Sequence, residues 1–304
     1  MTAPRIVSVL PSATEIVCAL GRRAQLIGRS EECDFPAGVR TLPVVMRART
    51  LDAERPSGEI DRRVQATRGR AESLYELDLA LLRTLRPEVL LTQDLCGVCS
   101  VTDAEVRAAC ATAGVAPEVV SVAPRRLAEV WDSVATIGRA IGAAAEAAVQ
   151  VASLRERSRP PAVPDGPTVA VVEWLDPPIL AGLWAPDLVA AGGGRSLHPE
   201  AGAPGIRTTW SRLGEQAPDL VLLSPCSFSV PRTLRELEDP ALAAAVRRLR
   251  PPLGVYVADE AYFSRPGPRL ADGVDLVRHL VRREPWEPPM PVAAYAAEER
   301  RAAA

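Results

Sequence analysis

The sequence predicts an α/β protein of two Rossmann-like lobes joined by one long helix. Short apolar runs alternate with helical segments along most of the chain, a pattern typical of parallel sheets covered by helices. The stretch RPEVLLT at 86–92 has a counterpart in APDLVLLS at 217–224, and each follows a leucine-bearing helical segment. Between these repeats, residues 125–157 are rich in alanine, leucine and arginine. They predict a helix of ~30 residues, or ~45 Å.

The domain organisation follows from these observations. A chain of 304 residues suggests about two domains of ~150 residues each. We expect an N-terminal lobe over 1–124, a connector helix over 125–160 and a C-terminal lobe over 161–284. The proline- and alanine-rich tail, 285–304, is expected to be loosely attached. A ligand cleft is predicted between the lobes, because open α/β sheets bind ligands at the carboxyl ends of their strands.

The N-terminal lobe alternates predicted strands and helices. Strands are expected at 6–10, 26–28, 44–46, 89–92 and 119–122, and helices at 15–20, 59–67, 74–85 and 103–112. Ser12 and Glu15 have the spacing of a capping box, and Gly21 ends the first helix. Residues 47–73 are polar and rich in arginine, without an apolar period. A loop of this length in a compact domain is usually functional or disordered.

The C-terminal lobe repeats this alternation after the proline-rich run at 159–167. Strands are expected at 169–174, 177–181, 220–224 and 254–258, and helices at 185–191, 210–216, 231–249 and from about 270 to 283.

Composition limits the partners. The net charge is −2, so neither a nucleic acid nor a membrane surface is an expected partner. No apolar run approaches the ~20 residues of a membrane-spanning helix, so no membrane insertion is expected. The first residues lack the apolar core and cleavage site of a signal peptide. The expected location is therefore the cytoplasm.

Residue counts also limit the chemistry. The chain contains no lysine, which excludes a Schiff base and a Walker A phosphate loop. The two histidines, His198 and His279, cannot form a histidine-rich metal site. We expect His198 at the surface and His279 in a structural role. No serine nucleophile elbow or nucleotide motif is present, so the catalytic residues stay unknown and enzymatic activity stays uncertain.

Cysteines give the main functional signal. In a reducing compartment, a Cys-x-x-Cys pair indicates metal ligation or redox chemistry rather than a disulfide. Cys96 and Cys99 form such a pair on the loop after the strand at 89–92. Cys33 and Cys226 also follow predicted strands. We predict that all four thiols face the cleft and bind a metal.

The spacing leaves the metal open. Thiolates bind zinc, copper(I) and iron–sulfur clusters. Four thiolates would clamp the cleft shut, whereas three from the N-terminal lobe would leave one metal position for a substrate or for Cys226. An open iron would then act as a Lewis acid. Cys18 and Cys110 lie in helices among apolar neighbours and are expected to be core residues. The alternative that the other four are also structural stays open.

Further candidates for the cleft combine aromatic and polar groups, as small-molecule sites do. Those that follow strands of the C-terminal lobe are Trp174, Asp259, Tyr262 and Arg265. Glu15 is either a helix cap or a ligand contact. Arg29 and Arg47 either hold an anionic ligand or are solvated.

Several motifs carry a resemblance to a known family. They are RIVSVLPSATE at 5–15, IGRSEECDFP at 27–36, the repeat strand at 86–92 and SRPGPRL at 264–270. With the long connector, the chain resembles the iron-siderophore and vitamin B12 solute-binding proteins of ABC importers, up to about residue 283. It is most similar to a cytoplasmic branch known as cobalamin-binding proteins. The resemblance implies the helical-backbone fold of these proteins, with a ligand bound in the interlobe cleft.

Three functions are compatible with these observations. The first is a cytoplasmic binding protein that holds an iron–sulfur cluster, a corrinoid or an iron chelate through thiolates. The second is a metalloenzyme that uses a cysteine-bound iron–sulfur cluster or metal as a Lewis acid on a small molecule. The third is an importer-type cobalamin-binding protein with structural cysteines. The missing export signal and the Cys-x-x-Cys pair make docking to a transporter doubtful.

Overall fold

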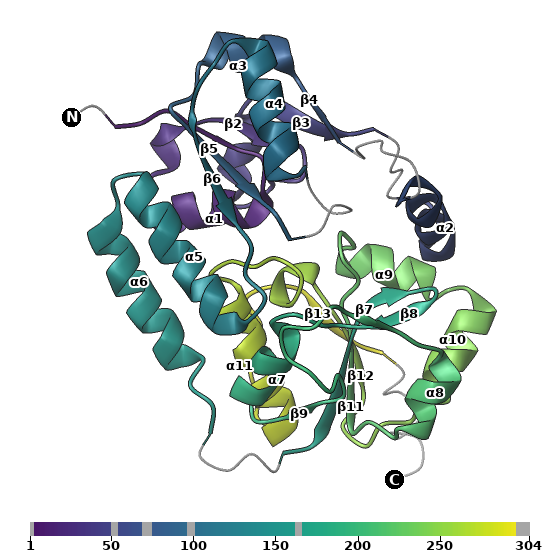
Figure 1. The fold of residues 1–304 in the computed structure, drawn as a ribbon. Coiled ribbons are helices and arrows are strands. Elements are labelled where there is room, and N and C mark those ends of the chain that lie inside the picture. Colours follow the sequence, from purple (N-terminus) through teal and green to yellow (C-terminus); the bar gives the residue numbers. More distant parts are fainter. Residues whose placement is uncertain (1–2, 50–53, 69–74, 96–100, 162–165, 296–304) are drawn as a thin grey trace. The chain divides into compact units, whose positions relative to one another are not determined.

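The computed structural model describes residues 3–49, 54–68, 75–95, 101–161 and 166–295 (Figure 1). The chain divides into two compact α/β units. The N-terminal unit contains Met1–Leu51, Val64–Pro124 and Ala128–Arg155, and the C-terminal unit contains Asp52–Arg63, Arg125–Leu127 and Glu156–Ala304.

The N-terminal unit is built on a six-stranded sheet. Its strands are β1 (Ile6–Ser8), β2 (Leu26–Ser30), β3 (Val44–Ala48), β4 (Tyr75–Leu77), β5 (Val89–Gln93) and β6 (Glu118–Val122). The spatial order is β4-β3-β2-β1-β5-β6, and only the β3–β4 pair is antiparallel. The chain builds outward from β1 to β4 and then starts again at β5 beside β1. The carboxyl ends of β1 and β5 therefore form a topological switch point, where such sheets bind ligands.

Four helices alternate with the strands of the N-terminal sheet within the described residues. They are α1 (Pro11–Ala19), α2 (Ser57–Arg68), α3 (Leu79–Leu85) and α4 (Asp103–Ala113), with short 3-10 turns at Arg23–Gln25 and Ala37–Thr41. A capping box of Thr102 and Glu105 starts α4. The capping box expected at Ser12 and Glu15 is wrong: α1 begins at Pro11 without a side-chain cap, because proline is preorganised for the first turn.

The connecting stretch is helical, as predicted, but it consists of two helices. These are α5 (Leu127–Ala140) and α6 (Ala144–Arg157). Gly142, at φ +71°, ends the first of them. Arg155 pairs with Asp132 at 2.7 Å, and a Cβ at Gly138 would lie 2.4 Å from the Cβ of Ala147. The two helices therefore pack closely as an antiparallel hairpin (Figure 1).

The C-terminal unit has a seven-stranded mixed sheet. Its strands are β7 (Thr168–Leu175), β8 (Pro178–Leu180), β9 (Arg195–Ser196), β10 (Ile206–Arg207), β11 (Leu220–Leu223), β12 (Val255–Ala258) and β13 (Val292–Tyr295). The main order is β10-β8-β7-β11-β12-β13. β7, β11 and β12 are parallel, so a second switch point lies between the ends of β7 and β11.

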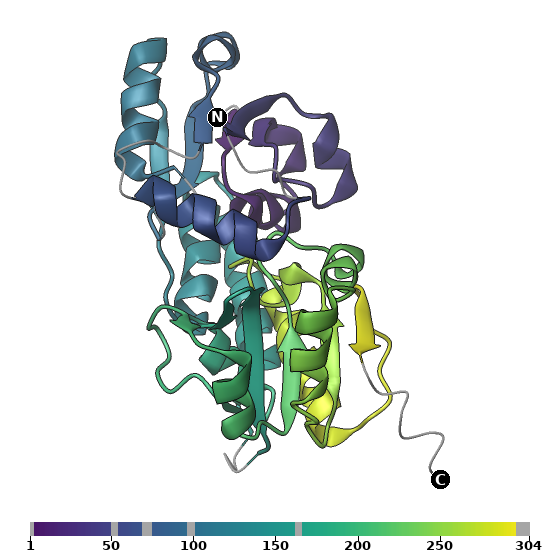
Figure 2. The ribbon, with the colours of Figure 1, turned by 90° about the vertical axis from the view of Figure 1, so that its right-hand side faces the viewer.

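The segment expected to be a loosely attached tail contributes the edge strand β13, drawn in yellow in Figure 2. This strand pairs antiparallel with β12 over four residues. The Tyr262 hydroxyl also donates to the carbonyl of Met290 at 2.8 Å and accepts from its amide at 3.0 Å. Pairing with β12 satisfies the backbone groups of β13. The proline-rich sequence before β13 gave no reason to expect a strand there.

Helices of the C-terminal unit are α7 (Ala185–Ala191), α8 (Trp210–Glu215), α9 (Val230–Glu236), α10 (Pro240–Arg247) and α11 (Leu270–Arg282), with a 3-10 turn at Glu260–Tyr262. The single helix expected at 231–249 is divided into α9 and α10. The Asp239 side chain accepts from the amide of Leu242 and starts a new helix at Pro240.

The predicted repeat is confirmed in its backbone. Arg86 and Ala217 precede the prolines of the two repeat strands, and both adopt the left-handed conformation, at φ 45° and 46°. In each unit, a helix (α3 or α8) thus ends in a left-handed residue followed by proline, and a fully buried strand follows. Within the residues described, no helix has the length and apolar character needed to span a bilayer.

Candidate functional site

The C-terminal unit gathers polar and aromatic groups at the carboxyl ends of β7, β11 and β12. Glu173 and Trp174 lie in the last three residues of β7, Cys226 follows β11, and Glu260 and Arg265 follow β12. The parallel register of the three strands places these groups along one edge of the sheet. The sequence predicted three of them, Trp174, Cys226 and Arg265. It missed the two carboxylates.

A buried ion pair organises the loop after β12. The Arg265 Nε donates to Glu260 Oε1 at 3.0 Å, and each side chain is only 12% exposed. The second Glu260 oxygen accepts from the amide of Ser227, on the loop after β11. Burial raises the pKa of Glu260, and the nearby Arg265 opposes that shift. The pair therefore fastens two neighbouring loops together.

Cys226 lies near two acidic side chains, Glu173 and Glu260. Burial raises the pKa of its thiol to about 12, and the negative charges of Glu260 and Glu173 add to the effect. Its amide donates to the carbonyl of Glu173 at 3.0 Å. A thiolate here would face two carboxylates in a desolvated setting, so the surroundings favour the neutral thiol.

Trp174 presents an indole at the same edge. Its ring packs against Phe228 with centroids 5.4 Å apart. The indole Nε1 is buried and has no hydrogen-bond partner among the described residues. A buried donor without a partner costs free energy, and a ligand that offers an acceptor would remove that cost.

Asp259 and Tyr262 make hydrogen bonds that shape the segment after β12. The Asp259 carboxylate accepts from the amide of Ala261 at 3.0 Å and caps the turn at Glu260–Tyr262. Tyr262 is fully buried, and its hydroxyl binds the backbone of Met290. Burial raises its pKa to about 12. Both residues thus help to fix the backbone after β12.

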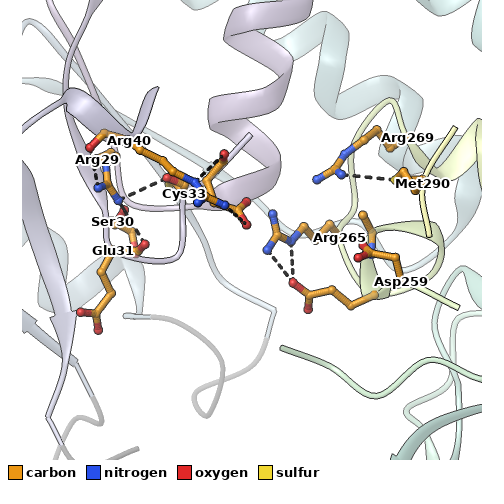
Figure 3. Close-up of polar contacts among 12 residues, drawn as sticks. Arg29, Ser30, Glu31, Cys33, Arg40, Asp259, Arg265, Arg269 and Met290 are labelled. Carbon is orange, nitrogen blue, oxygen red and sulfur yellow. Dashed lines mark hydrogen bonds and ion pairs between the residues drawn. The ribbon is translucent and has the colours of Figure 1, made fainter. Parts of the chain in front are cut away.

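In the N-terminal unit, Arg29 organises the loop after β2. Its Nη1 donates to the carbonyls of Ser30, Glu31 and Cys33 at 2.9–3.2 Å, and its Nη2 donates to Arg40 O at 3.0 Å (Figure 3). The side chain is buried and is occupied by backbone carbonyls. Arg47, in contrast, is exposed and lies 3.7 Å from Glu31. Arg29 therefore holds the loop in shape.

Cys33 is a core residue in this unit. It is 1% exposed. Its sulfur accepts from the Thr14 hydroxyl at 3.0 Å and lies 3.9 Å from Ser8 O. Cys110 is buried, as expected, and Cys18 is partly buried. Glu15 is also buried, within α1. The thiol of Cys33 has the surroundings of a small hydrogen-bonded core group.

The metal-site prediction depends on Cys96 and Cys99, which lie outside the described residues. Among the residues that are described, no group of three or more His, Cys, Asp or Glu side chains could hold a metal ion. Cys33 is buried and Cys226 is partly buried, and the four-thiolate site stays a prediction.

One further sequence prediction is wrong. His198 is 4% exposed and not on the surface. Its Nε2 lies 2.9 Å from Pro204 O, and its Nδ1 accepts from the amide of Glu200 at 3.2 Å. The imidazole satisfies backbone groups of a glycine- and proline-rich loop. His279 is structural, as expected, and stacks on Trp286 with centroids 5.1 Å apart.

Comparisons with known proteins identify the fold. No protein-family model matches the chain, and no curated protein matches it by sequence. Solved structures match over nearly the whole chain. A periplasmic heme-binding protein from Pseudomonas aeruginosa is 19% identical, with a TM-score of 0.69, and the match covers 97% of this chain and 99% of that one. The chain has the two-lobe fold of these binding proteins.

Two further structures are named for different ligands. The periplasmic vitamin B12 binding protein of Vibrio cholerae is 17% identical, with a TM-score of 0.59, over 92% of this chain and 97% of that one. The ABC-type Fe3+-hydroxamate transport system protein from Saccharomonospora viridis is 17% identical, with a TM-score of 0.63, over 91% and 93%. The predicted fold class, two α/β lobes with a helical connection, is confirmed.

Proposed function

We propose that this chain is a solute-binding protein for a metal-containing ligand of the heme, corrinoid or iron-chelate class. The observation that carries the proposal is the match over 97% of the chain to a binding protein with 99% of its own length covered. Both sheets also have a switch point between parallel strands, where ligands bind to open α/β sheets.

The C-terminal edge offers suitable contacts for such a ligand. Heme, corrinoids and iron chelates are large, with apolar or aromatic surface and polar groups at the rim. Trp174 supplies an aromatic face and a free buried donor. The Arg265–Glu260 pair fixes the loops on either side. A preorganised site of this kind loses little entropy when it binds.

The test is a titration of the purified full chain with hemin, cyanocobalamin and a ferric hydroxamate, followed by visible absorption. We expect saturable binding at micromolar concentration or below for one of them. Trp174→Leu should weaken that binding about tenfold, which corresponds to ~1.4 kcal/mol. Trp286→Leu is the matched control, because Trp286 stacks on His279 in the last turn of α11. Absence of binding to all three ligands would overturn the proposal.

We further propose that the ligand is passed to a transporter, contrary to the expectation from the sequence. The support is that the Saccharomonospora viridis protein is named as a transport system. The cytoplasmic location stays a prediction. Delivery of a ligand for uptake requires the protein to be on the outer side of the membrane. Cell fractionation separates the two, because a cytosolic protein would contradict delivery while leaving ligand binding in place.

The iron–sulfur and thiolate prediction has its own test. Anaerobic purification followed by iron and sulfide analysis should give metal in the wild type and none in Cys96→Ser/Cys99→Ser if the pair ligates it. Equal metal content in both proteins would refute the thiolate site. The enzyme alternative depends on the same cysteines and stays a prediction.

A further inference from the structure

We propose that a cavity of the C-terminal unit binds a small organic ammonium ion. The cavity has a volume of about 590 Å³, within the range of ~300–1,000 Å³ typical of small-molecule pockets. It is lined by residues just before α2, by the turn after β7 and by residues of α8, α9 and α10. All these segments belong to the C-terminal unit, which includes Asp52–Arg63.

This cavity is separate from the sheet edge described above. None of the described side chains that we assigned to the edge of β7, β11 and β12 lines it. A ligand in the cavity would therefore leave Trp174 and Arg265 uncovered. The site is a second one, and it does not rest on the proposed function.

Part of the lining is apolar. Trp210, the first residue of α8, and Leu242 of α10 line the cavity and also pack against the hydrophobic core of the unit. The Thr209 side chain accepts from the amide of Arg212 and fixes the start of α8. The indole is therefore positioned before a ligand arrives. Aromatic faces attract cations, and tryptophan does so best. The other apolar residues of the lining are Pro56, Ala241 and Ala245.

The charged part of the lining has more carboxylates than guanidinium groups. Two of its carboxylates are already neutralised. Glu236 pairs with Arg232 at 2.8 Å, and Glu54 pairs with Arg235 at 3.0 Å. These pairs account for both arginines of the lining. An anionic ligand would have to compete with a carboxylate for either of them.

Two further carboxylates of the lining are not neutralised. Asp176 follows directly after β7 and is exposed, and Asp239 precedes α10. Within the part of the chain that the structure describes, neither has an ion-pair partner. Asp239 accepts a hydrogen bond from the amide of Leu242 at 2.9 Å, which does not cancel its charge. Aspartate is negative at neutral pH, so a cation in the cavity would be attracted by both side chains.

The lining also indicates what kind of cation fits. Among the described residues, no group of three or more His, Cys, Asp or Glu side chains could hold a metal ion. An aromatic and apolar wall instead removes the apolar surface of an organic cation from water. The expected ligand therefore has an ammonium head and an apolar or aromatic body.

Calorimetric titration of the purified full chain tests the charge preference. The probes are 2-phenylethylammonium, 2-phenylethanol and phenylacetate, which share an aromatic body and differ in charge. We expect a dissociation constant of about 1 mM or tighter for the ammonium ion, in keeping with its small size. The alcohol and the carboxylate should bind at least about tenfold more weakly, because they lack the attraction to the aspartates.

Three variants assign binding to this cavity. Asp176→Asn, Asp239→Asn and Trp210→Leu should each weaken binding of 2-phenylethylammonium about fivefold. Asparagine is as good an N-cap as aspartate, so Asp239→Asn keeps the start of α10. Asp132→Asn is the matched control, because it removes an exposed carboxylate of α5 that does not line the cavity. If Trp210→Leu does not fold, the two aspartate variants carry the assignment.

Each result decides the proposal. Tight binding of the ammonium ion alone, weakened in the aspartate variants and unchanged in Asp132→Asn, would support it. Equal affinity for 2-phenylethanol would overturn the preference for a cation. Unchanged affinity in both aspartate variants, or no binding of 2-phenylethylammonium, would overturn the site. Trp174→Leu should leave ammonium binding unchanged, so failure here and failure of the proposed function are distinguishable.

Discussion

Two buried arginine–glutamate pairs in the C-terminal unit are alike in chemistry and differ in what they connect. Arg265 and Glu260 are each 12% exposed, and Arg232 and Glu236 are 9% and 8% exposed. The first pair joins the loops after β11 and β12, through the amide of Ser227. The second pair binds a segment 177 to 179 positions away in sequence.

The difference shows that such an ion pair does not by itself decide what it stabilises. Two charges taken out of water need further hydrogen bonds to offset the cost of desolvation. The backbone segment that donates those hydrogen bonds to the buried carboxylate is held in place by them. For Glu260 this is the adjacent loop, and for Glu236 it is Ser57, the first residue of α2. The same chemistry therefore joins two neighbouring loops in one place and two segments far apart in sequence in the other.

The largest effect is expected from Arg265→Ala. It leaves Glu260 buried without its cation, and breaking a buried pair in this way costs about 3–5 kcal/mol. Denaturant unfolding at pH 7 measures the loss. Because burial already raises the pKa of Glu260, the loss should shrink as the pH falls and the carboxyl takes up a proton. Arg265→Ala/Glu260→Gln should recover most of the stability. A loss below about 1 kcal/mol, as for an exposed pair, would contradict the role of the pair.

Arg232→Ala should cost less and act on a different region. Glu236 keeps both hydrogen bonds from Ser57, so we expect a loss of about 1.5–3 kcal/mol, typical of a bond to a charged group. Hydrogen exchange should accelerate at the amides of 54–63 and stay unchanged in the loop around Ser227. An equal rise of hydrogen exchange in both regions would contradict the idea that each ion pair stabilises a different segment.

The smallest effect concerns Cys226, whose thiol lies near the Glu260 carboxylate of the first pair. Burial and the neighbouring carboxylates raise the pKa of its thiol from the ordinary 9.0 to about 12. Between these values the unfolded thiol ionises and the folded one does not, so stability should fall with rising pH, by up to about 1.4 kcal/mol per pH unit. The difference in unfolding free energy between wild type and Cys226→Ser isolates this contribution. A constant difference across the alkaline range, from about pH 8 to about pH 10.5, would show that the thiol is not perturbed.

Much of the fold was predictable because it depends on local pattern. Buried parallel strands are continuous apolar runs, and the strands at 89–93 and 220–223 were found for that reason. Helix divisions were harder. Gly142 and Asp239 each end or start a helix within an alanine- or leucine-rich stretch, where the average propensity conceals a single interrupting residue.

The site was predictable only in part. Trp174 lies near the end of β7, and Cys226 and Arg265 follow β11 and β12, so the order of strands was enough to place all three at one edge of the C-terminal sheet. It could not show that Tyr262 and Asp259 point into the loop framework, or that Cys33 accepts a hydrogen bond from Thr14 in the core. Orientation of a side chain after a strand depends on loop conformation, which follows from contacts distant in sequence. Glu260 could have been suspected, since it follows directly after Asp259 at the end of a strand.

Local sequence was enough to establish the two α/β halves, their repeat and the sheet edges where polar residues gather, because these follow from the periodicity and order of neighbouring residues. It took the folded chain to show which of those residues are occupied by backbone groups, and that residues 54–63 belong with the C-terminal unit. A buried charge is stable only with partners, and the partners of Glu236 and Glu260 come from parts of the chain that no local pattern connects.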